Sequence, residues 1–255
     1  MAALDAQATA DAKAPVLLRT QGLTRRFGGL TAVDSVDFAL PEGEIRALIG
    51  PNGAGKTTFV SLLSGRIRPS AGRVEFDGRD VTQLKAHARV ARGIAYTFQI
   101  TSIFKAMSAR ENVMLAAQRR LTQGLLGPSE ERLRAEADAA LARVGLGSRA
   151  DEPAGALSYG HQRLLEVAMG LGLAPRLLIL DEPTQGLSDE EIAAFIDLVR
   201  DIARQSTVLL IEHNMQVVMG LADRITVLDR GAILAEGPPD AIRADEAVQR
   251  AYLGG

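Results

Sequence analysis

The chain contains no cysteine and no tryptophan, and aromatic residues make up only 4% of its 255 residues. Without a thiol it can form neither a disulfide framework nor a thiolate metal site, which is compatible with a reducing compartment. No apolar run approaches the ~20 residues that a membrane-spanning helix needs. The formal net charge of −2 offers no basic field for nucleic acid. We therefore expect a soluble protein with no nucleic-acid partner, which reaches any membrane through another subunit.

The composition is that of an ordinary globular protein. Hydrophobic residues make up 47% and charged residues 24%, and the length suits one large domain or two small lobes. The stretch from Met1 to Ala14 is alanine-rich and polar, without a basic start or a continuous apolar core. It is a poor signal peptide, so we expect residues 1–15 to be a flexible tail and residues 16–255 to form the domain.

Short apolar runs alternate with segments of helical period, which is typical of an α/β fold. Residues 44–49 read as a strand that leads into a glycine-rich turn. The runs 177–180 and 208–211 are almost wholly apolar, as expected of central strands that are covered on both faces. Hairpin turn signals at 77–78 and 229–231 indicate antiparallel pairs. We predict a mostly parallel sheet with an antiparallel β edge.

The middle of the chain differs in character. From residue 84 to residue 157 the strand signals are weak and the helical signals are strong. An apolar stripe at helical spacing consists of Leu133, Ala137, Ala140, Leu141 and Val144. We expect residues 84–157 to form a mainly helical lobe, inserted into a core lobe that is made of residues 16–83 and 158–255.

A glycine-rich segment after the first strand fits the phosphate-loop pattern G-x-x-x-x-G-K-[ST]. Its candidate nucleotide contacts are Gly50, Pro51, Asn52, Gly53, Ala54, Gly55, Lys56, Thr57 and Thr58. Glycines let successive backbone N–H groups turn inward around an anion, and the next helix adds its N-terminus. Lys56 would reach the β- and γ-phosphates, and the Thr57 hydroxyl would bind Mg²⁺. The alternative is an accidental turn, but chance produces this pattern in roughly one such chain in two hundred.

The strand at 177–180 ends in two carboxylates, Asp181 and Glu182. This is the Walker B pattern, in which Asp181 would hold Mg²⁺ and Glu182 would orient and polarise the attacking water. A helix-capping acid is the alternative interpretation of this pair. Together with the phosphate loop, the two carboxylates indicate a nucleoside triphosphatase.

The segment from Leu157 to Gln162 resembles the LSGGQ signature of ABC ATPases, and it precedes the Walker B strand as that family requires. Apolar residues at helical spacing follow it, which places Ser158 at a helix N-terminus, a setting that suits an anion. The resemblance implies that Ser158 and Gly160 complete the ATP site of a facing cassette. The alternative is that Ser158 is only a helix cap.

The remaining motifs of the family occur in order. Gln99 resembles the glutamine of the Q-loop, which implies contacts with Mg²⁺ and the attacking water. His213 resembles the switch histidine, which implies a contact with the γ-phosphate and support for Glu182. Phe27 matches the aromatic that stacks on adenine. The alternatives are a surface position for Gln99 and a core position for Phe27.

Three positions depart from the family pattern. The signature has Tyr159 where the common form has glycine, and His161 where it has glutamine. In the loop after Walker B, Ser188 stands where the family often has Asp or Asn. Ser188 and Glu191 have the spacing of a capping box, so Ser188 would serve mainly as a helix cap. None of these changes touches Lys56, so we expect full hydrolytic competence.

Within the family, three segments look most like the ATPases of branched-chain amino acid importers and their relatives for urea, short amides or aromatic acids. These segments are 27–30, 97–99 and 251–254. The resemblance implies ATP and Mg²⁺ as cofactors, a second cassette (a copy or a sister ATPase), permease subunits and, indirectly, a periplasmic solute-binding protein. It implies a peripheral position on the cytoplasmic face of the inner membrane.

Two other functions remain open. Lipopolysaccharide-export ATPases share the compact length, but they commonly carry Pro where this chain has Phe98. A soluble ABC protein that acts as a nucleotide-gated clamp usually has tandem cassettes, a long insertion or a basic tail. We also expect the permease to contact the segment 100–107, with Ile103, Phe104 and Met107 as candidates, for which the alternative is core packing.

Overall fold

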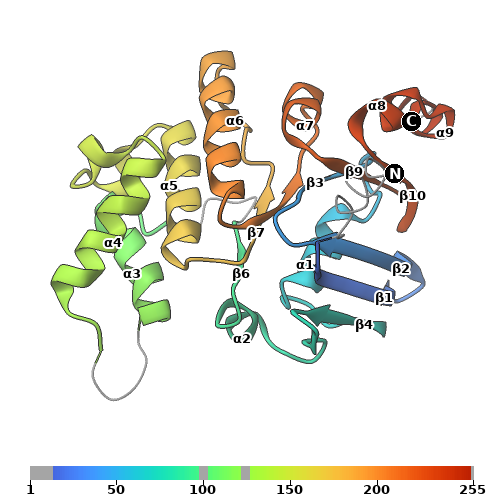
Figure 1. Ribbon diagram of the computed structural model, residues 1–255, viewed down its shortest axis with the longest axis horizontal. Coiled ribbons are helices and arrows are strands. Elements are labelled where there is room, and N and C mark those ends of the chain that lie inside the picture. Colours follow the sequence, from blue (N-terminus) through green and yellow to red (C-terminus); the bar gives the residue numbers. More distant parts are fainter. Residues whose placement is uncertain (1–13, 98–102, 122–126, 254–255) are drawn as a thin grey trace, which may run out of the picture.

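The computed structural model describes residues 14–97, 103–121 and 127–253, which form two sheets and a group of helices (Figure 1). A six-stranded sheet lies at the centre of the described chain. Its strands, in spatial order, are β10 (Ala232–Gly237), β9 (Arg224–Asp229), β3 (Ile45–Ile49), β8 (Thr207–Ile211), β7 (Leu177–Asp181) and β6 (Ile94–Tyr96). The second sheet is antiparallel and has the order β2 (Leu30–Pro41), β1 (Val16–Phe27), β4 (Ala71–Phe76), β5 (Arg79–Asp80).

The strands predicted at residues 44–49, 177–180 and 208–211 are confirmed as β3, β7 and β8. Every residue of β3, β7 and β8 is buried, because helices or the second sheet cover both faces. β8 pairs in parallel with both β3 and β7. The carboxyl ends of these strands therefore lie along one edge of the sheet, where ligands bind in open α/β sheets.

Both predicted hairpins form, but in different sheets. β9 and β10 make the antiparallel edge of the six-stranded sheet, and their turn places Arg230 and Gly231 at φ 47° and 84°. The turn at Asp77 and Gly78, with φ 53° and 68°, joins β4 and β5. These φ values suit the two-residue turns that match the twist of a hairpin. One antiparallel pair therefore lies at the edge of the central sheet, and the other lies in the second sheet.

The helices in the described residues fall into two groups. Three of them pack together at one end of the molecule: α3 (Ala109–Leu121), α4 (Glu130–Arg143) and α5 (Tyr159–Gly172). The others accompany the sheets: α1 (Lys56–Leu63), α2 (Ala86–Val90), α6 (Asp189–Ala203), α7 (Met215–Leu221), α8 (Pro239–Ala244) and α9 (Glu246–Leu253). In this part of the chain no helix is long and apolar enough to span a bilayer.

The lobe boundaries expected at residues 84 and 157 do not coincide with the division of the elements between the central sheet and the helical group. β6 lies within that range, yet it pairs in parallel with β7 and belongs to the central sheet. α5 begins after it, yet packs against α3 and α4. β6 was not predicted because a strand of three residues is too short to give a recognisable sequence pattern. α5 was placed in the core lobe because its apolar residues suit packing against both the sheet and the other helices.

Two buried clusters explain how the parts hold together. One lies between the antiparallel sheet, α1 and one face of the central sheet. The other joins the opposite face of that sheet to the three-helix group and includes Ala137, Ala140, Leu141 and Val144 of the predicted stripe. Burial of apolar surface of this kind stabilises by about 25 cal/mol per Å². The central sheet is therefore packed against buried apolar side chains on both faces.

One buried cation fixes the helix that follows the phosphate loop. Arg89 of α2 is fully buried and donates hydrogen bonds to the carbonyl oxygens of Leu62 (2.8 Å) and Leu63 (2.7 Å) at the end of α1. Burial lowers the pKa of Arg89 to about 10. A cation at the C-terminus of a helix satisfies terminal carbonyls and complements the helix dipole. The contact anchors α1, and with it the loop at its start.

Candidate functional site

The loop between β3 and α1 can be formed only by glycine at two positions. A Cβ on Gly50 would lie 2.1 Å from the carbonyl oxygen of Leu228, and one on Gly55 would lie 2.3 Å from that of Ala32. Gly55 also has φ 98°, in the region that favours glycine. The loop is thus pressed against Ala32 of β2 and Leu228 of β9, with α1 starting at Lys56.

Lys56 lies across this loop. Its Nζ donates hydrogen bonds to the carbonyl oxygens of Gly50 (2.5 Å) and Pro51 (3.0 Å). Burial lowers the pKa of Lys56, and the nearby Glu182 and Asp181 carboxylates oppose that shift. The ammonium therefore lies close enough to both carboxylates to interact with them electrostatically.

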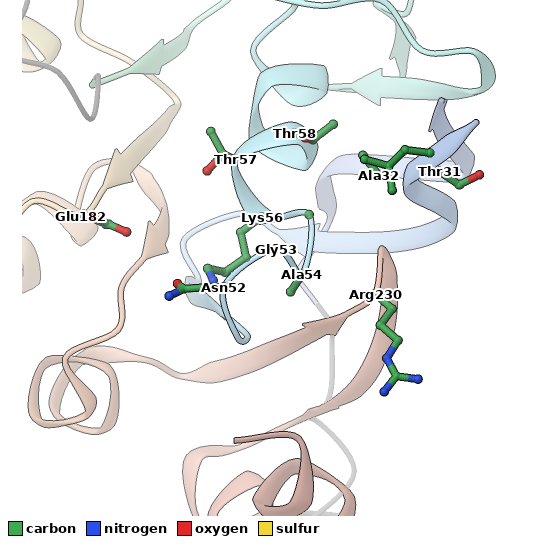
Figure 2. A pocket seen from close by; sticks show the side chains of 12 residues that line it. Thr31, Ala32, Asn52, Gly53, Ala54, Lys56, Thr57, Thr58, Glu182 and Arg230 are labelled. Carbon is green, nitrogen blue, oxygen red and sulfur yellow. The ribbon is translucent and has the colours of Figure 1, made fainter. Parts of the chain in front are cut away.

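A cavity of about 570 Å³ opens over the loop (Figure 2). It is lined by Leu30, Thr31, Ala32, Asn52, Gly53, Ala54, Gly55, Lys56, Thr57, Thr58, Glu182 and Arg230. Figure 2 shows Glu182 and Arg230 on opposite sides of Lys56. Residues 52–58 of the predicted phosphate loop thus face a cavity, together with a carboxylate from the end of β7 and a guanidinium from the turn after β9, whereas Gly50 and Pro51 do not line it.

Asp181 ends β7 and is 2% exposed. It accepts a hydrogen bond of 2.6 Å from the hydroxyl of Tyr96. Burial raises the pKa of Asp181, and Glu182 adds to the rise, whereas the Tyr96 hydrogen bond lowers it. The pKa of Tyr96 is raised by its burial and by the bond to Asp181. Sequence reasoning missed Tyr96, because the contact depends on the unpredicted pairing of β6 with β7.

Glu182 adopts a backbone conformation that is unusual for its residue type. Its φ is 48°, and its N–H donates a 2.9 Å hydrogen bond to the carbonyl oxygen of Ile211. A non-glycine residue in this region is strained, and such strain is concentrated at functional sites. His213 lies beside it, with Nδ1 at 3.9 Å from Glu182 Oε1, and its side chain is 68% exposed. The structure therefore brings together Lys56, Asp181, Glu182 and His213.

The signature segment lies apart from this cavity. Ser158 is exposed and caps α5, where its Oγ accepts a 3.2 Å hydrogen bond from the N–H of His161. Gly160 packs so closely on Leu187 that a Cβ there would lie 2.8 Å from Leu187 Cδ2. Neither Ser158 nor Gly160 lines the cavity over the phosphate loop. Within one chain these two residues therefore do not reach the site that holds Lys56.

Tyr159, which departs from the common signature, makes a specific contact. Its ring covers Gly186, where φ is 82° and a Cβ would lie 2.6 Å from Tyr159 Cδ1. Gly186 belongs to the loop that follows Glu182, so the start of α5 is packed against that loop. The predicted capping box at Ser188 and Glu191 is confirmed at the start of α6.

Two predicted site residues remain to be placed. Phe27 is 45% exposed, and its ring is covered by the guanidinium of Arg25 at 4.4 Å. Phe27 does not line the cavity, whereas Leu30, its partner across the hairpin, does. Gln99 lies outside the described residues. Their roles in binding adenine and water stay predictions.

Comparisons with known proteins identify the family of the chain. Residues 33–185 match the family "ABC transporter", and residues 232–255 match "Branched-chain amino acid ATP-binding cassette transporter". The chain is 40% identical to the high-affinity branched-chain amino acid transport ATP-binding protein BraF of Pseudomonas aeruginosa, over 93% of this chain and 98% of that protein. It is 41% identical to LivG of Escherichia coli, with the same coverage.

Solved structures give the same result. The crystal structure of a nucleotide-free ATP-binding cassette from an ABC transporter superposes with a TM-score of 0.86 at 28% identity, covering 94% of this chain and 100% of that one. A cassette in its ADP conformation gives 0.85, also at 28% identity, with the same coverage. The chain belongs to the ATP-binding cassette family of ABC transporters. The predicted fold class and the predicted activity, ATP hydrolysis coupled to transport, are confirmed.

Proposed function

We propose that this chain powers the import of branched-chain amino acids or related small amides and acids. The main observation in favour of ATP hydrolysis is that one cavity is lined by both the phosphate loop and Glu182. The match of residues 232–255 and the names of the two relatives support the solute class. The solute itself would be recognised by other subunits, since the described cavity is built for phosphate.

The residues of the cavity suit ATP and Mg²⁺. Backbone N–H groups of residues 52–58 would surround the phosphates, and Lys56 would bind the β- and γ-phosphates. The hydroxyl of Thr57 and the carboxylate of Asp181 are the oxygen donors that Mg²⁺ prefers. Asp181 does not itself line the cavity, but it is buried at the end of β7, close enough to Lys56 to interact with it electrostatically. When bound, Mg²⁺ would neutralise charge that develops on the phosphate oxygens.

Glu182 is the group best placed to activate water. It lines the cavity at the end of β7 and can accept a proton from a water that attacks the γ-phosphate. His213 lies beside it and would contact the γ-phosphate and hold Glu182 in place. We assign Gln99 to the water and the metal ion on the family resemblance alone.

A second cassette would complete the site. Ser158 and Gly160 lie at the N-terminus of α5, which favours an anion. Since they do not line the cavity of their own chain, we propose that they bind the ATP of a facing cassette. That cassette is a copy of this chain or a sister ATPase.

The other proposed partners are permease subunits on the cytoplasmic face of the inner membrane and, through them, a periplasmic solute-binding protein. Phe104 supports this, because its large apolar side chain is 56% exposed within the segment expected to meet the permease. Ile103 is half-buried and packs against the core, so it is less available for such a contact.

Uptake measurements test the solute class. A strain that lacks this gene should take up radiolabelled leucine, isoleucine and valine more slowly, and the wild-type gene should restore uptake. Lys56→Ala should not restore it, because the phosphates lose their cation. Lys85→Ala, at an exposed position outside both the cavity and the segment 100–107, should restore it fully. Unchanged uptake of all three amino acids in the deletion strain would contradict this solute class.

A further inference from the structure

A buried carboxylate lies between the two loops that carry the proposed catalytic groups. Glu212 follows β8 and is 2% exposed. Its Oε1 accepts hydrogen bonds from the backbone N–H of Thr184 (3.0 Å) and from its hydroxyl (2.5 Å). Its Oε2 accepts from the backbone N–H groups of His213 (3.1 Å) and Asn214 (3.2 Å). One oxygen therefore holds the loop after β7, and the other holds the loop after β8.

This arrangement is suited to fixing the distance between the loops. Three of the four donors are backbone N–H groups, whose positions are set by the chain itself. A buried carboxylate is tolerated only when it is well hydrogen-bonded, and hydrogen bonds to a charged acceptor are shorter and stronger than neutral ones. Glu212 therefore cannot move away from either loop without losing hydrogen bonds, and because the carboxylate is buried, water does not replace them.

The loops that Glu212 joins carry Glu182 and His213. The left-handed backbone of Glu182, with φ 48°, persists only where the surroundings fix it. Its own N–H is held by Ile211, and two residues further on Thr184 is held by Glu212. The same carboxylate binds the backbone of His213, whose Nδ1 lies 3.9 Å from Glu182. A change at Glu212 would therefore displace both groups.

We infer that Glu212 is a positioning residue for ATP hydrolysis, which acts through Glu182 and His213. The inference rests on the roles proposed for these two residues. Misplacement of a reacting group by about 1 Å can reduce a rate by about 10²-fold. ATP binding, in contrast, depends mainly on the phosphate loop, to which Glu212 makes no hydrogen bond within the described residues. Loss of the Glu212 carboxylate should therefore lower the rate of hydrolysis and leave the affinity for ATP nearly unchanged.

Glu212→Gln is the direct test, because it keeps the shape and removes the charge. A carboxamide has one acceptor oxygen, so its NH₂ group must face the N–H donors of one loop. We expect kcat for ATP to fall at least tenfold, whereas KM and the Kd of a fluorescent ATP analogue change less than twofold. Glu44→Gln is the matched control, since Glu44 pairs with the buried Arg46 at the opposite end of β3. It should leave kcat unchanged.

Thr184→Val gives a second measurement that preserves volume and removes one donor to Glu212. It should lower kcat about threefold on its own. In the Glu212→Gln background it should lower kcat no further, since residues that act through one network are not additive. If Glu212→Gln does not fold, the Thr184→Val effect on kcat at constant Kd decides the question.

Several results would overturn the inference. Wild-type kcat in Glu212→Gln would do so, as would a loss of kcat accompanied by an equal loss of ATP affinity, which is the sign of a structural role. Wild-type kcat in Thr184→Val, or additive effects in the double variant, would also do so. Glu182→Gln is assayed in parallel. If Glu182→Gln is inactive while Glu212→Gln is fully active, the inference fails and the proposed function stands.

Discussion

At the scale of single residues, the site gathers one ammonium and two carboxylates in a partly buried cluster at the end of β7. Burial acts against each charged form, because a charge taken out of water loses solvation. It lowers the pKa of Lys56 and raises that of Asp181, while the opposite charges partly compensate in Lys56. Such opposed shifts are concentrated at functional sites. In this protein, the buried charges lower the stability of the nucleotide-free form.

Asp181→Asn should stabilise the nucleotide-free protein at neutral pH. The folded pKa of Asp181 lies above its unfolded value, so ionisation costs stability above the folded pKa, and the cost disappears as the pH falls to about 4. At pH 7.5, without Mg²⁺, the melting temperature should therefore rise above that of the wild type. The gain should shrink at pH 4.5.

Asp197→Asn is the control for this prediction, because the Asp197 side chain is 80% exposed. It should shift the melting temperature little at either pH. An Asp181→Asn protein that melts no higher than wild type at pH 7.5, or a gain that does not depend on pH, would show that burial of this carboxylate is not costly.

At the scale of elements, the parallel strands place their following loops side by side. The phosphate loop follows β3, Glu182 follows β7 and His213 follows β8, so residues far apart in sequence meet at one edge. α6 orients the loop after β7, since its capping box fixes where the helix starts. Ser188 Oγ accepts from the N–H of Glu191 at 3.3 Å, and the Glu191 carboxylate accepts from the N–H of Ser188 at 2.8 Å.

Ser188→Ala should lower the free energy of unfolding by about 1 kcal/mol, which is the typical cost of losing an N-cap. Urea denaturation followed by circular dichroism would measure it. Ser148→Ala, at an exposed serine in the short turn Gly147–Arg149, should change this free energy by less than about 0.5 kcal/mol. Equal effects of the two substitutions would contradict the capping role.

Local patterns predicted the elements that carry the chemistry. The apolar runs of β7 and β8, the glycine-rich turn and the capping box each have a signal within a few residues. Pairings between strands that are distant in the sequence have no such local signal. β1 pairs with β4, as in Leu18 with Phe76, to form a separate sheet, and β6 joins the central sheet through only three residues. Tyr96 and Glu212 were missed for the same reason, because their partners are distant in sequence.

At the scale of the whole molecule, we propose that one chain contributes to two ATP sites, its own and that of a facing cassette. The cavity contains the phosphate loop and Glu182, while Ser158 and Gly160 lie at the start of α5, outside it. Tyr159 covers Gly186, so the signature end of α5 and the loop after Glu182 are packed together. A facing cassette that binds at the signature would therefore press on the loop that carries Glu182.

Ser158→Arg should abolish hydrolysis and preserve ATP binding. The long side chain would fill the space that a facing phosphate needs, but it lies outside the cavity of its own chain. The matched control is Ser129→Arg, which removes an N-cap serine from α4 in the helical group. Hydrolysis should continue in the control. Normal phosphate release by Ser158→Arg would contradict the shared site.

The most direct test of the account is the rate of ATP hydrolysis by Glu182→Gln in the assembled transporter. The substitution removes the proton acceptor and keeps the volume, so phosphate release should fall by about 10²-fold or more, in the range typical of a lost general base. ATP should still bind with nearly wild-type affinity and should hold the two cassettes together. Hydrolysis at the wild-type rate would contradict the assignment of Glu182 as the group that activates water.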